Sequence, residues 1–265
     1  CQVPSTARTW LAALVAVVTL AGCTSAAAPT TPLDGIRISP VAGIAVDRPS
    51  LPAVPLKVDG LLAGLTGGGL APYLGQVVTW FACGADKCTN VVVPLDYANP
   101  GRAAVTVALR MKPATASPKL GPLFVNPGGP GGSGQALVDY FDNQGLEQYD
   151  IVGWDPRGTG GSTPVRCLTD EQADAFLALD ASPDNEAERE ALIRGNYDFG
   201  KGCWERNGDY LNHIGTVDTV RDLDLLRQLL GAPKLNYLGY SYGTDIGAVY
   251  AELFGGNTRH LVLDA

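Results

Sequence analysis

The sequence predicts an α/β fold in which a mostly parallel β-sheet is flanked by helices. Short valine-rich runs bounded by turn residues are typical of buried strands, and longer segments with apolar residues at helical spacing alternate with them. This alternation favours crossover helices that cover a largely parallel sheet. With 265 residues, of which 46% are hydrophobic, the chain is long enough to bury the core of one large domain.

The N-terminal region departs from this pattern. Residues 9–22 form an apolar run behind Arg8, which is too short for an ordinary membrane span and has the length of a signal-peptide core. The run ends in LAGC at 20–23, which resembles the lipobox of bacterial lipoproteins, so we expect a signal peptide over 1–22 and a lipid on Cys23. An ordinary secretory signal is the alternative, and both send the protein across the membrane.

Composition divides the rest of the chain into two parts. Residues 23–75 are rich in Ala, Pro, Gly and Thr with little periodicity, which indicates a lipidated N-terminus followed by a tether. The folded domain is expected over 76–265. Its expected strands are 77–81, 89–95, 105–111, 123–125, 149–154, 235–239 and 259–263. Its expected helices are 135–141, a polar region over 170–210 that breaks at Ser182-Pro183, 217–230 and 242–254.

Four cysteines remain in this domain, and export places them in an oxidising compartment. Four cysteines allow three pairings. We favour Cys83 with Cys88 and Cys167 with Cys203, because each pair is close in sequence. A zinc site is the rival interpretation, but the spacing does not suit it and the chain has only two histidines. No metal or cofactor is expected.

The pentapeptide GYSYG at 239–243 fits the pattern G-x-S-x-G and lies between an apolar strand and an apolar helix. In a nucleophile elbow, a sharp strand-to-helix turn exposes a strained serine, and small neighbours make room for the turn. Ser241 is therefore the candidate nucleophile. A glycine-lined turn around a buried serine is the alternative.

A second glycine-rich segment, NPGGPGG at 126–132, follows an expected strand well upstream of Ser241. Acyl transfer needs preorganised N–H donors for a negatively charged oxygen. In hydrolases with the elbow, one donor follows the nucleophile and the other lies in such a loop. We assign these roles to Tyr242 and Gly129, with Gly128 as the alternative to Gly129. A phosphate-binding loop would need a lysine before Ser133, where the chain has Gly132.

Taken together, PGGPGG, GWDPRGTGGS at 153–162 and GYSYGT at 239–244 resemble the proline iminopeptidase and tripeptidyl aminopeptidase family of serine hydrolases. VPLDYANP at 93–100 and DTVRDLDLLRQLLG at 218–231 resemble its secreted actinobacterial branch. The resemblance implies an α/β-hydrolase core with a helical cap, and removal of residues from peptide N-termini. Asp155 and Arg157 lie in the DPRG turn, which we interpret as shaping the site; an ordinary ion pair is the alternative.

The resemblance also implies that a complete member continues for about another domain length beyond residue 265. We therefore expect the cap, the later strands, and the triad acid and histidine to be absent from these residues. His260 begins the last expected strand and His213 precedes a helix. We therefore expect both at the end of the sheet opposite Ser241. Asp264 ends the last strand on the catalytic side, but the family's acid comes later.

The expected function is an exported serine hydrolase of the aminopeptidase type that forms an acyl-enzyme on Ser241 and is inactive within these residues alone. An esterase or lipase on the same fold is the nearest alternative, and a non-catalytic, lipid-anchored binding protein is another. The expected partners are a peptide substrate and, through the lipid, the membrane. A net charge of −8 without a basic stripe argues against nucleic acid.

Overall fold

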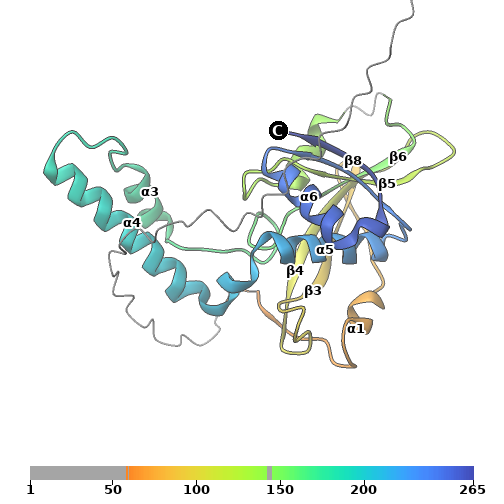
Figure 1. Ribbon diagram of the computed structural model, residues 1–265, viewed down its shortest axis with the longest axis horizontal. Helices are drawn as coiled ribbons and strands as arrows, with labels where there is room; N and C mark the ends of the chain where they lie inside the picture. The colour runs from red at the N-terminus through yellow and green to blue at the C-terminus, as the bar shows by residue number, and fades with distance from the viewer. Residues whose placement is uncertain (1–57, 59, 142–144) are drawn as a thin grey trace, which may run out of the picture. The chain divides into compact units, whose positions relative to one another are not determined.

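The computed structural model describes residue 58 and residues 60–141 and 145–265. The signal peptide, Cys23 and most of the expected tether lie outside this part of the chain. The elements are β1 (Leu62–Ala63), α1 (Ala71–Leu74), β2 (Phe81–Cys83), β3 (Asp86–Pro94), β4 (Ala103–Lys112), β5 (Gly121–Asn126), α2 (Gly134–Leu137), η1 (Val138–Tyr140), β6 (Tyr149–Trp154), α3 (Asp170–Leu177), α4 (Glu186–Asn207), η2 (Gly208–His213), α5 (Thr216–Leu229), β7 (Leu235–Tyr240), α6 (Tyr242–Phe254), η3 (Gly255–Asn257) and β8 (Thr258–Asp264) (Figure 1).

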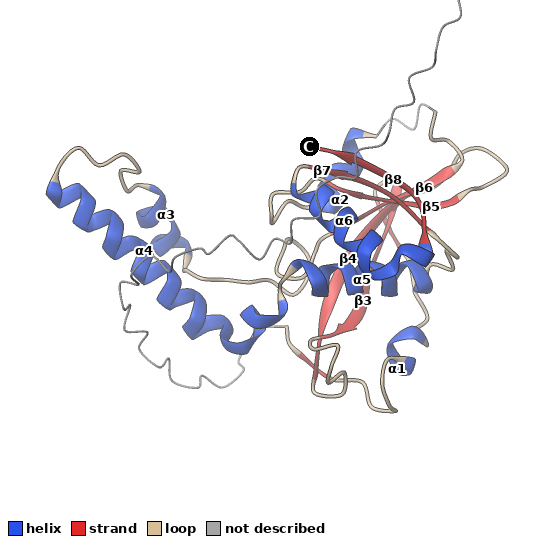
Figure 2. Cartoon of the chain, in the orientation of Figure 1, coloured by secondary structure: helices blue, strands red, loops and turns tan. Residues whose placement is uncertain are grey.

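In the part of the chain that the structure describes, the strands form one eight-stranded sheet in the order β2-β3-β4-β6-β5-β7-β8, with β1 paired to β4. Figure 2 shows the strands in red and the helices in blue. Strands β6, β5, β7 and β8 are parallel to one another, whereas β1 to β4 join through antiparallel pairs. The sheet is therefore mixed, and its parallel half contains β7, which leads into Ser241. The carboxyl ends of parallel strands meet at one edge of a sheet, and loops at that edge are where ligands bind in open α/β sheets.

The central strand β5 shows how the two faces of the sheet are covered. Leu123 and Val125 point to one face and pack with Val138, which lies in η1 directly after α2. Phe124 points to the other face, into the core that also contains Leu223 of α5. Because both faces are buried, nearly every residue of the strand is apolar, and period-2 alternation is absent from the sequence.

Nearly all of the expected strands and helices are present, with ends shifted by a few residues. The exception is the first strand, which we expected over 77–81. It begins only at Phe81, and Val77 is 90% exposed, because β2 pairs with β3 through the turn that the Cys83–Cys88 disulfide spans. Valine propensity alone does not make a strand that has no partner. Part of the segment expected as tether also packs on the domain: β1 pairs with β4, and Tyr73 of α1 is fully buried.

The polar insertion between β6 and α5 folds as a pair of helices, α3 and α4. Both of the cysteine pairs expected from the sequence are joined, and the Cys167–Cys203 disulfide closes the base of this pair. Buried Asn207 reinforces the closure: its side-chain amide accepts from Arg166 N at 3.2 Å and donates to Arg166 O at 2.9 Å. Among the described residues, no helix has the length and apolar character that a membrane crossing requires.

Candidate active site

Ser241 lies between the end of β7 and the start of α6, at the carboxyl edge of the parallel strands. Its backbone angles are φ 50° and ψ −124°, and no other non-glycine residue in the described ranges has positive φ. Such a conformation costs about 1–3 kcal/mol and persists only where the surroundings impose it. Here Ser241 N donates to Asp264 O at 2.8 Å, and Ser241 is exposed. The turn has the geometry of a nucleophile elbow.

The glycines on both sides of the elbow are required by close backbone contacts. A Cβ at Gly239 would lie 2.3 Å from Gly243 O, and a Cβ at Gly243 would lie 2.9 Å from Asn126 O. No side chain tolerates such distances to backbone atoms. The G-x-S-x-G spacing therefore reflects the packing of α6 against its own strand and against the end of β5.

The glycine-rich loop after β5 lies directly against the elbow. A Cβ at Gly128 would be 2.4 Å from Tyr240 O and 2.7 Å from Tyr242 N. Gly128 and Gly129 also have φ values of 87° and 114°, which side chains disfavour. The loop therefore brings its backbone next to the N–H of Tyr242, the residue after Ser241, which is the arrangement of an oxyanion hole.

The hydrogen bonds distinguish between the two glycines proposed as donors. Gly128 N donates to Asn126 Oδ1 at 2.9 Å, so this N–H is occupied within the loop. No hydrogen bond of the described residues uses Gly129 N. Tyr242 is the first residue of α6, and the first N–H groups of a helix have no intrahelical acceptor. Gly129 N and Tyr242 N therefore both lack an acceptor among the described residues, as the roles assigned to them require.

A cavity of about 190 Å³ adjoins this arrangement. It lies between the glycine-rich loop, the turn after β6 and the start of α5, and Gly128, Thr159, Ile214 and Tyr242 are among the residues that line it. Arg157 also borders the cavity, but all five N–H groups of its guanidinium donate to protein oxygen atoms. The cavity wall beside the elbow therefore offers apolar surface and no free charge.

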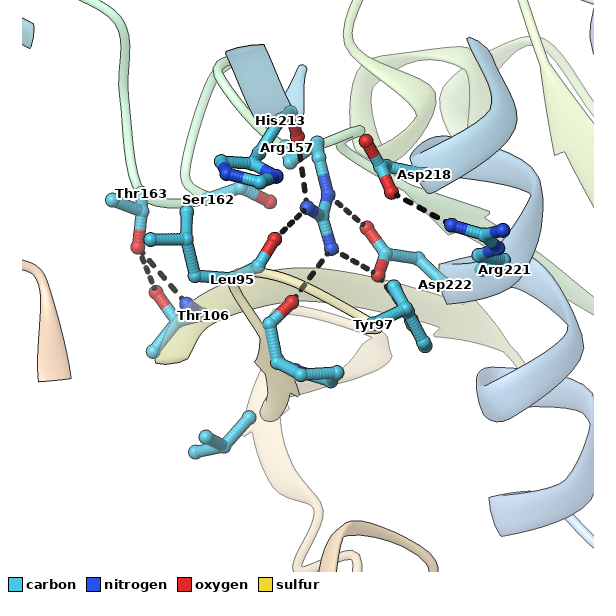
Figure 3. Close-up of polar contacts among 12 residues, drawn as sticks. Leu95, Tyr97, Thr106, Arg157, Ser162, Thr163, His213, Asp218, Arg221 and Asp222 are labelled. Carbon is cyan, nitrogen blue, oxygen red and sulfur yellow. Dashed lines mark hydrogen bonds and ion pairs between the residues drawn. The ribbon is translucent and has the colours of Figure 1, made fainter. Parts of the chain in front are cut away.

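Arg157, in the turn after β6, forms a buried ion pair with Asp222 of α5 (Figure 3). Its Nε and Nη2 donate to the carboxylate at 2.7 and 2.6 Å, and Tyr97 OH donates to the same carboxylate at 2.7 Å. The remaining three N–H groups donate to the carbonyl oxygens of Pro94, Leu95 and His213. Burial opposes the charge of Arg157, but Asp222 raises the pKa of the guanidinium above its ordinary value. Arg157 therefore joins β3, η2 and α5 beneath the site, which favours the ion-pair interpretation of this residue.

The structure corrects the expected place of His213. Its carbonyl oxygen accepts from Arg157, which follows the carboxyl end of β6, so His213 lies at the same edge as Ser241. The expectation was wrong because α5 runs antiparallel to β7 and therefore begins at the carboxyl edge. The imidazole nevertheless faces Asp209, with Nε2 3.6 Å from Asp209 Oδ2. No hydrogen bond among the described residues joins it to Ser241.

His260 lies where the sequence places it, at the far edge of the sheet. It pairs with Asn236, five residues before Ser241, which corresponds to roughly 16 Å along the strand. Asp264, in contrast, pairs with Tyr240 and lies beside the elbow, with its main-chain oxygen bound to Ser241 N. No group of three or more His, Cys, Asp or Glu side chains in the described part of the chain is arranged to hold a metal ion.

Three residues at the site had no role in our interpretation of the sequence. Asn126 fixes Gly128; Thr216 Oγ1 lies 2.7 Å from Tyr242 OH; and Asp222 holds Arg157. An Asn two residues before a glycine suggests a side chain that binds its own backbone, so Asn126 had a local signal. Thr216 and Asp222 act across long sequence separations, and their positions in a helix give no such signal.

Comparison with known proteins agrees with this geometry. Residues 121–265 match the family model described as alpha/beta hydrolase fold. The chain is 39% identical over 203 residues to the tripeptidyl aminopeptidase of Streptomyces lividans, covering 71% of this chain and 38% of that protein. It is 39% identical over 212 residues to serine protease Hip1 of Mycobacterium tuberculosis, covering 73% and 40%. It is 40% identical over 222 residues to carboxylesterase B of the same species, covering 76% and 42%.

The chain thus spans about two fifths of the length of these curated relatives. The family model covers residues 121–265, more than half of the chain, and within that range lie β5, the glycine-rich loop and the elbow. The chain belongs to the α/β-hydrolase fold family.

Proposed function

We propose that this chain carries the nucleophile and the oxyanion hole of an exported serine hydrolase that releases single residues or short peptides from peptide N-termini. The observation that carries the proposal is the elbow, where exposed Ser241 with φ 50° lies against a loop with a free N–H at Gly129. The names of the tripeptidyl aminopeptidase and serine protease relatives support the peptidase reaction.

In this mechanism, Ser241 Oγ attacks the carbonyl carbon of the scissile bond while a histidine base removes its proton. The carbonyl oxygen becomes negatively charged and accepts hydrogen bonds from Gly129 N and Tyr242 N. The proton then passes to the leaving amine, and water hydrolyses the acyl-enzyme. The base is a histidine other than His213 and His260, because neither of these is in place. The mechanism therefore takes its base from outside residues 1–265.

An esterase is the second candidate, and the similarity to carboxylesterase B favours it. The two reactions share the acyl-enzyme and differ only in the leaving group, which the elbow and the oxyanion hole do not select. The third candidate is a non-catalytic protein that binds peptides.

The test uses the polypeptide encoded by the complete open reading frame, assayed with tripeptide anilides and with short-chain nitrophenyl esters. We expect faster turnover of the anilides, and Ser241→Ala should abolish it, while Ser182→Ala in the loop between α3 and α4 should leave it unchanged. Turnover of esters alone would support the esterase. Anilide turnover that persists in Ser241→Ala would remove Ser241 from the mechanism, and peptide binding without any turnover would identify a binding protein.

We further propose that the protein is a lipoprotein attached to the membrane through Cys23. The LAGC tetrapeptide at 20–23 supports this, and the two disulfides are compatible with an oxidising compartment. A diacylglycerol supplies two acyl chains, which is enough for stable anchoring. Cys23→Ala should move the protein from the detergent phase to the aqueous phase after expression in a bacterial host. Equal membrane association of the variant and the wild type would contradict lipidation.

A further inference from the structure

Asp155 is a buried carboxylate directly after β6, in the turn that faces the glycine-rich loop. Only 1% of the residue is exposed. Its Oδ1 accepts from Ser133 Oγ at 2.6 Å and from Gln135 N at 3.2 Å. Its Oδ2 accepts from Gln135 Nε2 at 2.7 Å and from Gly161 N at 2.8 Å. The carboxylate therefore binds both the end of the glycine-rich loop and its own turn.

The four partners of this carboxylate are all neutral. Among the described residues, no ion pair involves Asp155, in contrast to Arg157 two residues later. A buried charge is tolerated when hydrogen bonds replace its hydration, and such charge-assisted bonds are stronger than those between neutral groups. A negative charge close to an oxyanion hole would oppose the developing charge there. The benefit of Asp155 must therefore lie in the geometry that its four bonds impose.

That geometry concerns the segment between Asn126 and Gln135. At its start, Asn126 Oδ1 holds Gly128 N. At its end, Asp155 holds Ser133 and Gln135, which are the N-cap and second residue of α2. The close packing of the turn supports the same contact, since a Cβ at Gly160 would lie 2.2 Å from Asp155 Oδ2. The loop is thus fixed at both ends, with Gly129 between them.

We propose that Asp155 is a positioning residue, which acts through Ser133 and Gln135 to hold the loop so that Gly129 N points at the oxyanion. This inference rests on the proposed serine-hydrolase function. Asp155 does not touch substrate. Its contribution is to keep Gly129 N and Tyr242 N directed at the same oxygen atom. A displacement of about 1 Å of such a group from its productive position can lower a rate about 10²-fold.

The test compares Asp155→Asn with Gln135→Met, because each keeps the side-chain size. An amide in place of the carboxylate has a single acceptor oxygen, so Asp155→Asn must lose the two bonds of the other oxygen. In the complete reading-frame protein we expect kcat to fall about 10²-fold with little change in KM. Gln135→Met, which loses one bond, should give a smaller fall in kcat. In the 265-residue chain itself, the hydrogen-bonded amides of Gly128, Gly132 and Gln135 should exchange hydrogen faster in Asp155→Asn.

Asp150→Asn is the matched control. Asp150 lies near the other end of β6, where it accepts from Ala114 N and Lys119 Nζ. This variant should leave kcat and loop exchange unchanged. Unaltered loop exchange in Asp155→Asn would overturn the proposal, as would a loss of activity that follows only the unfolded fraction. If the complete protein has no Ser241-dependent turnover, the proposed function fails, and the exchange measurement still decides whether Asp155 holds the loop.

Discussion

Replacing Arg157 by methionine is expected to lower the free energy of unfolding of the chain by about 3–5 kcal/mol. The Arg157 side chain is fully buried, that of Asp222 is 1% exposed, and all five N–H groups of the guanidinium are bound. Methionine keeps much of the volume but leaves the Asp222 carboxylate buried without its counter-ion. Three backbone carbonyls lose their donors at the same time, so the ends of β3, η2 and α5 separate more easily.

Urea denaturation at neutral pH measures this effect. The control is Arg102→Met, because Arg102 pairs with Asp209 at the surface with 45% and 34% of the two side chains exposed. An exposed pair of this kind contributes about 0–1 kcal/mol. The double variant Arg157→Met with Asp222→Leu should recover part of the loss, since an apolar pair replaces the buried ion pair. Equal losses for Arg157→Met and Arg102→Met would mean that the buried pair does not hold these segments together.

The polypeptide of residues 1–265 is expected to show no Ser241-dependent turnover. A serine hydroxyl needs a base within about 2.6–3.2 Å to become a nucleophile. His260 lies at the opposite edge of the sheet, and the His213 ring faces Asp209. Loss of the triad histidine typically lowers kcat about 10⁶-fold. We therefore expect a rate close to that of the uncatalysed reaction, raised only by what the oxyanion hole contributes.

The measurement is to purify this polypeptide beside its Ser241→Ala variant and to assay both with anilides and esters. The two should be indistinguishable. A difference between them in the ordinary enzymatic range, about 1–10³ s⁻¹, would show that these residues contain a working base. His213→Gln would then be the next variant, because His213, unlike His260, lies at the same edge of the sheet as Ser241.

The sequence predicted those features that depend on local patterns. The strands β3 to β8, the helix α6 and the elbow at Ser241 follow from valine-rich runs, helical spacing and a glycine-flanked serine. Both disulfide pairs followed from proximity in the chain once export was inferred. Such features are determined within a few residues, so one sequence is enough to find them.

Features that depend on contacts between distant segments were not predictable in this way. The partner of Arg157 is 65 residues away, and nothing in the local sequence of α5 distinguishes Asp222 from Asp218. The place of His213 was wrong because it depends on the direction of α5 relative to β7, which requires the topology and not the spacing. We assigned the donor role to Gly129 with Gly128 as the alternative, and the bond from Gly128 N to Asn126 Oδ1 gives a physical reason for that order.

The closed base of the α3–α4 pair has a consequence for how this fold can change over evolution. The Cα atoms of Cys167 and Cys203 lie 3.8 Å apart, and Asn207 ties the same point to Arg166. The segment between Cys167 and Cys203 therefore leaves the domain and returns to it at one place. Each doubling of the length of such a closed loop costs only about 0.6 kcal/mol in conformational entropy. The insertion can therefore be shortened, extended or exchanged for another sequence without altering the register of the sheet. Because both ends of the insertion join the domain between β6 and α5, each exchange would change the surface there and leave the strands and the elbow as they are.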